Sequence, residues 1–136
     1  MTTIKVFLAG LLLGGLIGGA ESLAAAASQP TRTNSGGGVT VKVTPIDLKA
    51  NGDLRFMIVL DTHSVNLDAY DLKSIAVLRD DSSKSYSPTA VENKGGGHHR
   101  EAVLSFPKPA LKTKRIELLI KDVAGVNERT FLWDLE

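Results

Sequence analysis

From Val39 onward, hydrophobic and polar residues alternate with a period of two. The first such stretch, VTVKVTP (Val39–Pro45), alternates valine with threonine and lysine and ends at a proline. Because successive side chains of a strand point to opposite faces, this pattern predicts a half-buried β-strand. The Asn51-Gly52 pair that follows is typical of a tight turn between two strands.

Five further segments have the composition of strands, and a seventh strand is expected around Tyr86. The five segments are Leu54–His63, Lys73–Asp81, Glu101–Pro107, Arg115–Val123 and Arg129–Leu135. Only NLDAYDLK (Asn66–Lys73) is compatible with a short helical turn. Many short alternating strands predict an all-β fold, an antiparallel immunoglobulin-like β-sandwich of about seven strands, with a small closed barrel as the alternative.

The N-terminal part of the chain differs in pattern from the rest. A lysine precedes the unbroken apolar run VFLAGLLLGGLIGGA (Val6–Ala20), and the small residues of ESLAAAAS follow. This order is typical of a secretory signal, with cleavage predicted before Ser28 or after Ala20. The alternative is an uncleaved membrane anchor, although the run is shorter than the roughly 20 residues that span a bilayer, and Glu21 interrupts any extension.

These observations divide the chain into three parts. Residues 1–27 are the predicted signal peptide or N-terminal membrane anchor, and residues 28–38, which lack apolar side chains, are a predicted flexible linker. Residues 39–136 are the predicted β-sandwich domain. Whether the N-terminal segment is cleaved or not, the domain is expected to be exported to the periplasm or the cell exterior. Contact with a membrane is expected only through that segment, if it stays uncleaved.

Composition excludes several classes of function. The formal net charge is +1, with 16 basic and 15 acidic residues interspersed, so nucleic acid is not an expected partner. The chain has no cysteine, which excludes disulfides, thiolate metal sites, cysteine nucleophiles and a lipid-modified cysteine. A blue-copper centre is excluded for the same reason.

The segment GGGHHR (Gly95–Arg100) contains two of the three histidines of the chain. His63, His98 and His99, with Asp61, are candidate ligands for zinc or copper, because imidazole and carboxylate suit these ions. Adjacent strand residues point to opposite faces, so His98 and His99 can share an ion only if the glycines keep the segment irregular. The alternative is a structural hydrogen bond between Asp61 and a histidine, which joins two loops.

Motifs for catalysis are not found in the sequence. The sequence THS around His63 is not a nucleophile elbow, DDSSKS (Asp80–Ser85) lacks the ligand spacing of a calcium loop, and no Gly-Lys-Ser/Thr follows the glycine runs. We therefore expect that the protein is not an enzyme and has no cofactor apart from a possible metal ion.

Four segments of the chain resemble an uncharacterised exported β-sandwich domain of prokaryotes. These segments are LDTHSVNLD, SIAVLRDD, GGGHHREAVLSFP and IELLIKDVAGVNERTFLWDL. The resemblance covers the chain from Val39 onward. The distinctive motifs of that family pattern are Asp-Thr-His-Ser and Gly-His-His-Arg, and they are matched at Asp61–Ser64 and at Gly97–Arg100. The resemblance implies an exported domain behind a signal or anchor, and the likeness to immunoglobulin-like domains implies a binding or scaffold role by analogy.

The expected function is that of a non-catalytic binding or interaction module of the cell envelope, with an unknown protein or envelope partner. The ligand is expected at the loops of one end of the sandwich or along an exposed strand edge. The alternative is a zinc- or copper-binding protein that uses the histidine cluster.

Overall fold

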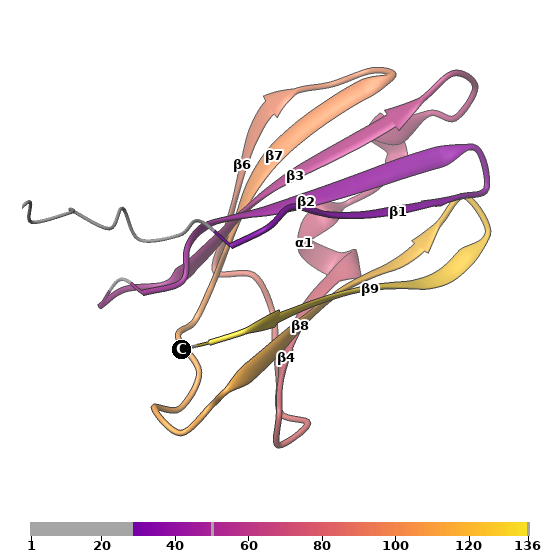
Figure 1. Cartoon of the computed structure of the whole chain (residues 1–136). Helices are drawn as coiled ribbons and strands as arrows, with labels where there is room; N and C mark the ends of the chain where they lie inside the picture. The colour runs from indigo at the N-terminus through magenta and orange to yellow at the C-terminus, as the bar shows by residue number, and fades with distance from the viewer. Residues whose placement is uncertain (1–28, 50, 136) are drawn as a thin grey trace, which may run out of the picture.

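The computed structural model describes residues 29–49 and 51–135, so the predicted signal or anchor, residues 1–27, lies outside the described residues. The described chain is all-β, with two short helices in one loop (Figure 1). The strands are β1 (Arg32–Gly36), β2 (Val39–Asp47), β3 (Leu54–Thr62), β4 (Ala76–Asp80), β5 (Ser85–Tyr86), β6 (Ala90–Gly95), β7 (His99–Phe106), β8 (Arg115–Val123) and β9 (Val126–Asp134).

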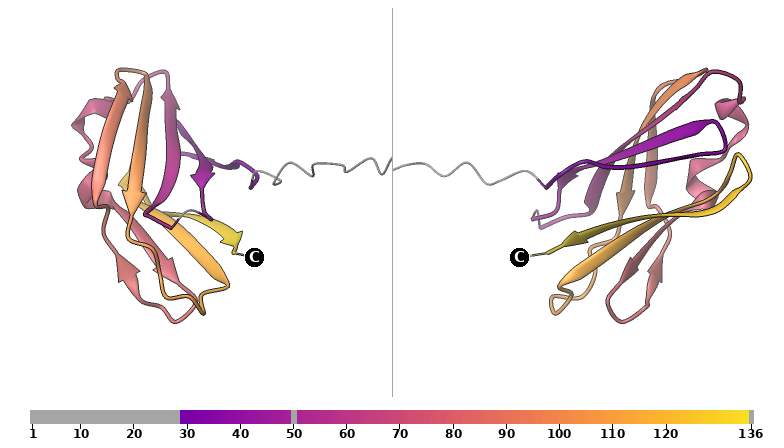
Figure 2. Two further views of the ribbon diagram at one scale, coloured as in Figure 1. Left: turned by 90° about the vertical axis from the view of Figure 1, so that its left-hand side faces the viewer. Right: turned by 45° about the vertical axis from the view of Figure 1, so that its right-hand side comes forward.

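The strands form two antiparallel sheets. One sheet has the order β1-β2-β3-β7-β6 and the other the order β5-β4-β8-β9. The two layers are visible from both sides in Figure 2, and they fit the predicted β-sandwich. The alternative of a closed barrel is wrong, because within the described residues each sheet ends in edge strands that do not pair with the other sheet.

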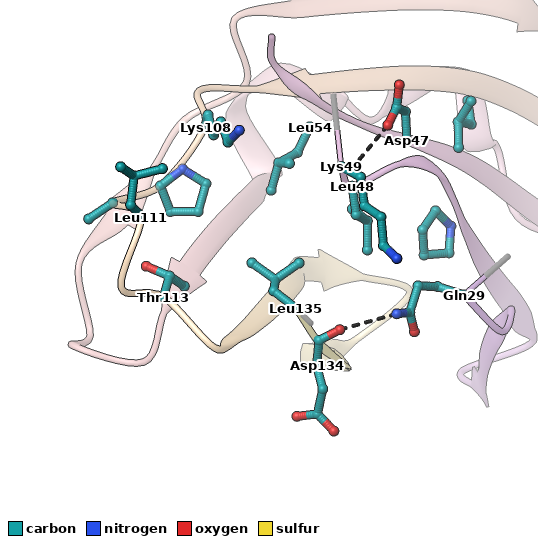
Figure 3. Close-up of a pocket in the computed structure, with 14 residues that line it drawn as sticks. Gln29, Asp47, Leu48, Lys49, Leu54, Lys108, Leu111, Thr113, Asp134 and Leu135 are labelled. Carbon is teal, nitrogen blue, oxygen red and sulfur yellow. Dashed lines mark hydrogen bonds between the residues drawn. The ribbon is translucent and has the colours of Figure 1, made fainter. Parts of the chain in front are cut away.

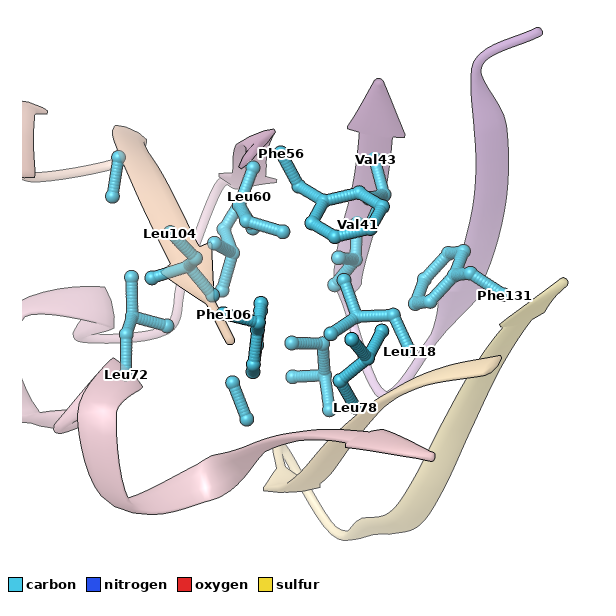
Figure 4. Close-up of a cluster of buried hydrophobic side chains, with 14 of the residues drawn as sticks. Val41, Val43, Phe56, Leu60, Leu72, Leu78, Leu104, Phe106, Leu118 and Phe131 are labelled. Atoms are coloured by element: carbon cyan, nitrogen blue, oxygen red, sulfur yellow. The ribbon is translucent and has the colours of Figure 1, made fainter. Parts of the chain in front are cut away.

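The core lies between the two sheets, where the inward residues of alternating positions meet (Figure 4). Val41 and Phe56 face inward from the first sheet, and Leu118 and Phe131 face them from the second. The Trp133 ring lies 5.4 Å from the Phe56 ring, across the two sheets. Burial of these faces is the main force that holds the sheets together, at about 25 cal/mol per Å² of apolar surface.

The loop between β3 and β4 contains η1 (Leu67–Ala69) and α1 (Leu72–Ile75), two short turns where the sequence predicted one. Asn66 and Asp71 cap them by accepting hydrogen bonds from the main chain two residues later. The helix α1 packs against β4, β6 and β8 and so touches both sheets. None of the helices in the described residues has the length and apolar content needed to cross a membrane.

Two strands correct the predictions from sequence. Residues 28–38 were predicted to be a flexible linker, but β1 lies within them and pairs along its whole length with β2, so the sheet begins before Val39. The strand β6 was not predicted either, and residues 29–49 and 51–135 form nine strands rather than about seven. Both are edge strands with mostly exposed polar side chains, so neither shows the hydrophobic alternation that marks the other strands.

Candidate functional site

The loops of the domain gather at two opposite ends (Figure 1). We call one end the histidine end; it consists of the turns at residues 37–38, 63–71, 96–98 and 124–125. We call the other the cavity end; it consists of residues 45–49, 107–114 and 134–135, together with Gln29. The residues predicted from sequence lie at the histidine end, and a cavity that the sequence did not predict lies at the other.

Asp61 and His99 come together at the histidine end because β3 and β7 are paired there. The two residues are direct partners in the antiparallel register. The Nδ1 atom of His99 makes a short hydrogen bond with Oδ1 of Asp61, and its Nε2 lies 3.4 Å from Oε1 of Glu101. The predicted hydrogen bond between Asp61 and a histidine is thus present, although it joins two strands rather than two loops.

The surroundings of His99 favour a charged imidazolium. The hydrogen bond to Asp61 and, next, the one to Glu101 raise the pKa of His99 above its ordinary value. A metal ion would need a ring nitrogen without a proton, so it would compete with this arrangement. The two carboxylates lie on different ring nitrogens and therefore do not converge with the imidazole on one point.

The other two histidines occupy exposed turns. His63 follows the end of β3, and His98 lies in the hairpin turn between β6 and β7, where Gly97 has a φ of +79°. In the described part of the chain, no group of three or more histidine, aspartate or glutamate side chains is arranged to hold a metal ion. Zinc or copper binding by these residues stays a prediction.

Arg100 is a residue of this end that the sequence analysis did not single out. Its side chain, 9% exposed, points inward and donates hydrogen bonds to the main-chain oxygens of Leu67 and Tyr70, at 2.7 and 2.5 Å. Asn93 Oδ1 lies 3.4 Å away from the same guanidinium. Arg100 thereby fastens the helical loop to β7.

Arg129 has the same role on the other side of this end. It is fully buried and donates to the main-chain oxygens of Gly36, Val39 and Val123, at 2.8, 3.2 and 3.1 Å, and to Oδ1 of Asn34 at 3.1 Å. Within the described residues its Nε has no hydrogen-bond partner. Burial lowers the pKa of Arg129. The guanidinium joins the β1–β2 turn to the β8–β9 turn.

Both arginines could have been found from the alternation of the strands. Arg100 is in phase with the buried Ala102 and Leu104, and Arg129 is in phase with Phe131 and Trp133. An arginine at an inward position of a strand needs several acceptors, because burial of an unpaired charge is costly. An arginine that alternates in phase with the buried residues of a strand therefore indicates a buried hydrogen-bond network.

The two distinctive segments of the sequence belong to this network. Thr62 donates to the oxygen of Gly38 at 2.8 Å and accepts hydrogen bonds from the main-chain nitrogens of Ser64 and Val65. The nitrogen of Gly97 donates to Oδ1 of Asp68 at 3.1 Å. Both segments therefore tie neighbouring loops together.

The cavity end has a different character. A cavity of about 490 Å³ opens there between the two sheets, and Figure 3 shows its lining. Leu48, Leu54 and Leu135 form part of its apolar wall. At its rim, Ile46 is 46% exposed and Leu111 is 94% exposed, the highest value among the large hydrophobic residues that are exposed in the described chain.

A few polar groups surround this apolar wall. The side chain of Gln29 donates to the main-chain oxygen of Asp134 at 3.2 Å, and Lys49 and Lys108 also line the cavity. No sequence motif marks this site, because three loop segments far apart in the chain build it. Only the isolated Leu111 among the polar residues of PKPALKTK (Pro107–Lys114) was unusual.

Comparison of the chain with protein-family models, with curated proteins and with solved structures finds no match, so its function has to be inferred from its own residues.

Proposed function

We propose that the protein is an exported, non-catalytic binding module with an immunoglobulin-like domain, and that its partner meets the cavity end. The strand order supports the immunoglobulin-like assignment. Without β1, the first sheet has the order first, second, sixth and fifth strand (β2-β3-β7-β6), which corresponds to A-B-E-D of immunoglobulin domains. The second sheet, β5-β4-β8-β9, corresponds in the same way to C′-C-F-G.

The cavity is the observation that carries the binding proposal. Concave sites with an apolar lining and a few polar groups are the usual places where proteins bind ligands. The cavity end combines such a lining with Ile46 and Leu111, whose exposed apolar surface has no cover in the described chain. A partner that covers this surface would gain the free energy of removing it from water.

A titration with anilinonaphthalene sulfonate, a fluorescent probe with apolar rings and one negative charge, tests this proposal. We expect saturable binding at one site in the wild type. The double variant Ile46→Ser/Leu111→Ser should bind about tenfold more weakly, because two apolar contacts are lost. Since both side chains are exposed, the variant should stay folded, which circular dichroism can verify.

Leu132→Ser is the matched control. Leu132 is 46% exposed, as Ile46 is, but it lies on β9 outside this cavity. Its substitution should leave the affinity for the probe unchanged. Equal binding by the wild type and by the Ile46→Ser/Leu111→Ser variant would contradict the assignment of the cavity as the binding site.

Export is a separate part of the proposal, and the apolar run Val6–Ala20 supports it. Mass spectrometry of the protein from the producing cells should find a new N-terminus at Ser28 or Glu21 if the segment is a cleaved signal. An intact N-terminus in the membrane fraction would indicate an anchor. An intact chain in the cytosol would contradict export.

Metal binding is the second candidate function, because imidazole and carboxylate, the groups that Asp61 and His99 bring together, are ligand types for zinc and copper. An ion would have to displace the proton that this hydrogen bond holds on the ring. Calorimetric titration with zinc and with copper tests it. Binding that is lost in a His63→Ala/His99→Ala variant would support a histidine site. Absence of heat from the wild type would leave the hydrogen-bonding role of His99 as the sufficient explanation.

A further inference from the structure

We propose that the partner of the cavity end is an anionic membrane surface, onto which the domain docks with Leu111 inserted at the interface. This inference rests on the proposed function, since it names the partner that covers the same surface. Three independent features of the chain carry it: the composition of one loop, the apolar residues beside that loop, and the place where the chain enters the domain.

The loop of residues 107–114, PKPALKTK, has the composition of an interfacial segment. It carries three lysines and no acidic residue, and Leu111 lies at its centre with 94% of its surface exposed. Lys112 and Lys114 follow Leu111 and are exposed as well. Lysines attract anionic lipid headgroups, while an exposed leucine gains free energy by leaving water for the boundary of the acyl chains.

The apolar surface extends from this loop to neighbouring segments. Ile46, near the end of β2, is 46% exposed and lines the cavity, as do Leu48 and Leu135 (Figure 3). Acidic groups of this end have partners within the protein. Asp134 contacts Arg115 at 3.1 Å, and Asp81 accepts a hydrogen bond from the main chain of Lys114 at 2.9 Å.

The chain enters the domain at the same end. Gln29, the first described residue, lines the cavity. The apolar run ends at Ala20, so only residues 21–28 separate it from Gln29. Eight residues span at most about 28 Å when fully extended. A membrane that holds the apolar run would therefore keep the cavity end, rather than the histidine end, within reach of its surface.

The histidine end presents polar rather than apolar side chains at its turns. Asp61 and Glu101 flank His99, and Asp68 lies beside Gly96 and Gly97. None of the exposed large hydrophobic residues of the described chain lies at the turns of this end, so it lacks an apolar anchor and is expected to face away from the membrane. It is therefore a suitable control position in the same molecule.

Site-specific fluorescence on the full chain tests the inference, and the absence of native cysteine makes single labelling simple. Leu111→Cys and His98→Cys are each labelled with the same environment-sensitive dye and reconstituted into vesicles of phosphatidylcholine with about 30% phosphatidylglycerol. Nitroxide groups on the acyl chains then quench any dye that enters the bilayer. We expect a blue shift and at least about threefold stronger quenching at position 111 than at position 98.

The charge requirement is tested in the same system. Quenching at position 111 should fall in vesicles of pure phosphatidylcholine and in a Lys112→Gln/Lys114→Gln variant, because headgroup attraction is lost. Equal quenching at positions 111 and 98 would overturn the inference. Quenching at position 111 that is the same in vesicles with and without phosphatidylglycerol would overturn it as well. If this happens while the probe still binds the cavity, the proposed function stands and only the membrane partner is wrong. If position 111 is quenched but the probe does not bind, membrane docking stands without a binding cavity.

Discussion

At the histidine end, Arg100 and Arg129 are buried and donate hydrogen bonds to main-chain oxygens, whereas at the cavity end Ile46 and Leu111 expose 46% and 94% of their surface. The two ends belong to the same pair of sheets. They differ in whether the groups they contain find partners inside the protein. Six main-chain oxygens of the described residues receive a guanidinium hydrogen bond at the first end.

This difference separates residues that stabilise the fold from surface that is available to a partner. The histidine end contains the residues that look functional in the sequence, yet their hydrogen bonds are directed to one another and to neighbouring loops. The cavity end was not marked by such residues, but Ile46 and Leu111 at its rim have no cover among the described residues. Uncovered apolar surface beside a cavity indicates a partner more directly than a satisfied polar network does.

The largest expected effect concerns Arg129, whose substitution would break the network of the histidine end. Arg129→Met should lower the free energy of unfolding by about 4 kcal/mol, because the buried oxygens of Val39 and Val123 and the part-buried oxygen of Gly36 lose a charged donor. Urea denaturation measures this change. Arg115→Met, at an exposed arginine that pairs with Asp134, should change it by less than about 0.5 kcal/mol.

A pair of glycines at the same end gives the next largest contrast. Gly37 has a φ of +64°, and a Cβ atom there would lie 2.1 Å from the oxygen of Ala124. Gly97 has a φ of +79° but open space around it. Gly37→Ala should therefore cost about 3 kcal/mol of stability and Gly97→Ala about 1 kcal/mol. If thermal denaturation gave equal losses of stability for the two variants, the turn at Gly37 would not pack against the turn at Ala124.

A smaller effect concerns the pH dependence that His99 adds. Because its pKa in the folded protein is raised, its contribution to stability is complete below pH 6.5, the ordinary pKa of histidine, and is lost as pH rises through the raised value. The His99→Gln variant should lack this part of the pH profile, whereas His98→Gln should keep it. Denaturation on both sides of pH 6.5 measures the profiles, and a wild-type stability that rises over this range would have the wrong sign.

The smallest effect on stability is expected at the cavity end. Leu111→Ser should change the free energy of unfolding by less than about 0.5 kcal/mol, since the side chain is 94% exposed. The same variant should weaken binding of the fluorescent probe. A large loss of stability would mean that Leu111 supports the fold and is not available to a partner.

Much of the fold could be predicted from the sequence because burial imposes a period of two on central strands. Phe56, Leu104 and Leu118 all lie at inward positions that alternation predicted. The edge strands β1 and β6 could not be predicted in this way. Their stability comes from main-chain pairing and from contacts such as the 2.9 Å hydrogen bond between Ser35 and Thr40, which leave no hydrophobic pattern.

The candidate site could be predicted only in part. The meeting of Asp61 with a histidine was expected, because both residues lie at strand ends, but the choice of His99 required the register of β3 and β7. The cavity requires three loops to converge, and convergence depends on the sheet packing rather than on any local motif. A site that is built from loops far apart in the sequence therefore leaves no recognisable pattern in any one of them.

The most direct test of the account is to map the bound probe onto the chain by following backbone amide resonances during a titration with anilinonaphthalene sulfonate. If the cavity end is the binding end, the resonances that shift belong to residues 45–49, 108–113 and 134–135, and those of residues 61–65 and 96–99 stay in place. Shifts centred on Asp61–Ser64 and His98–His99 instead would contradict the central claim and would assign binding to the histidine end.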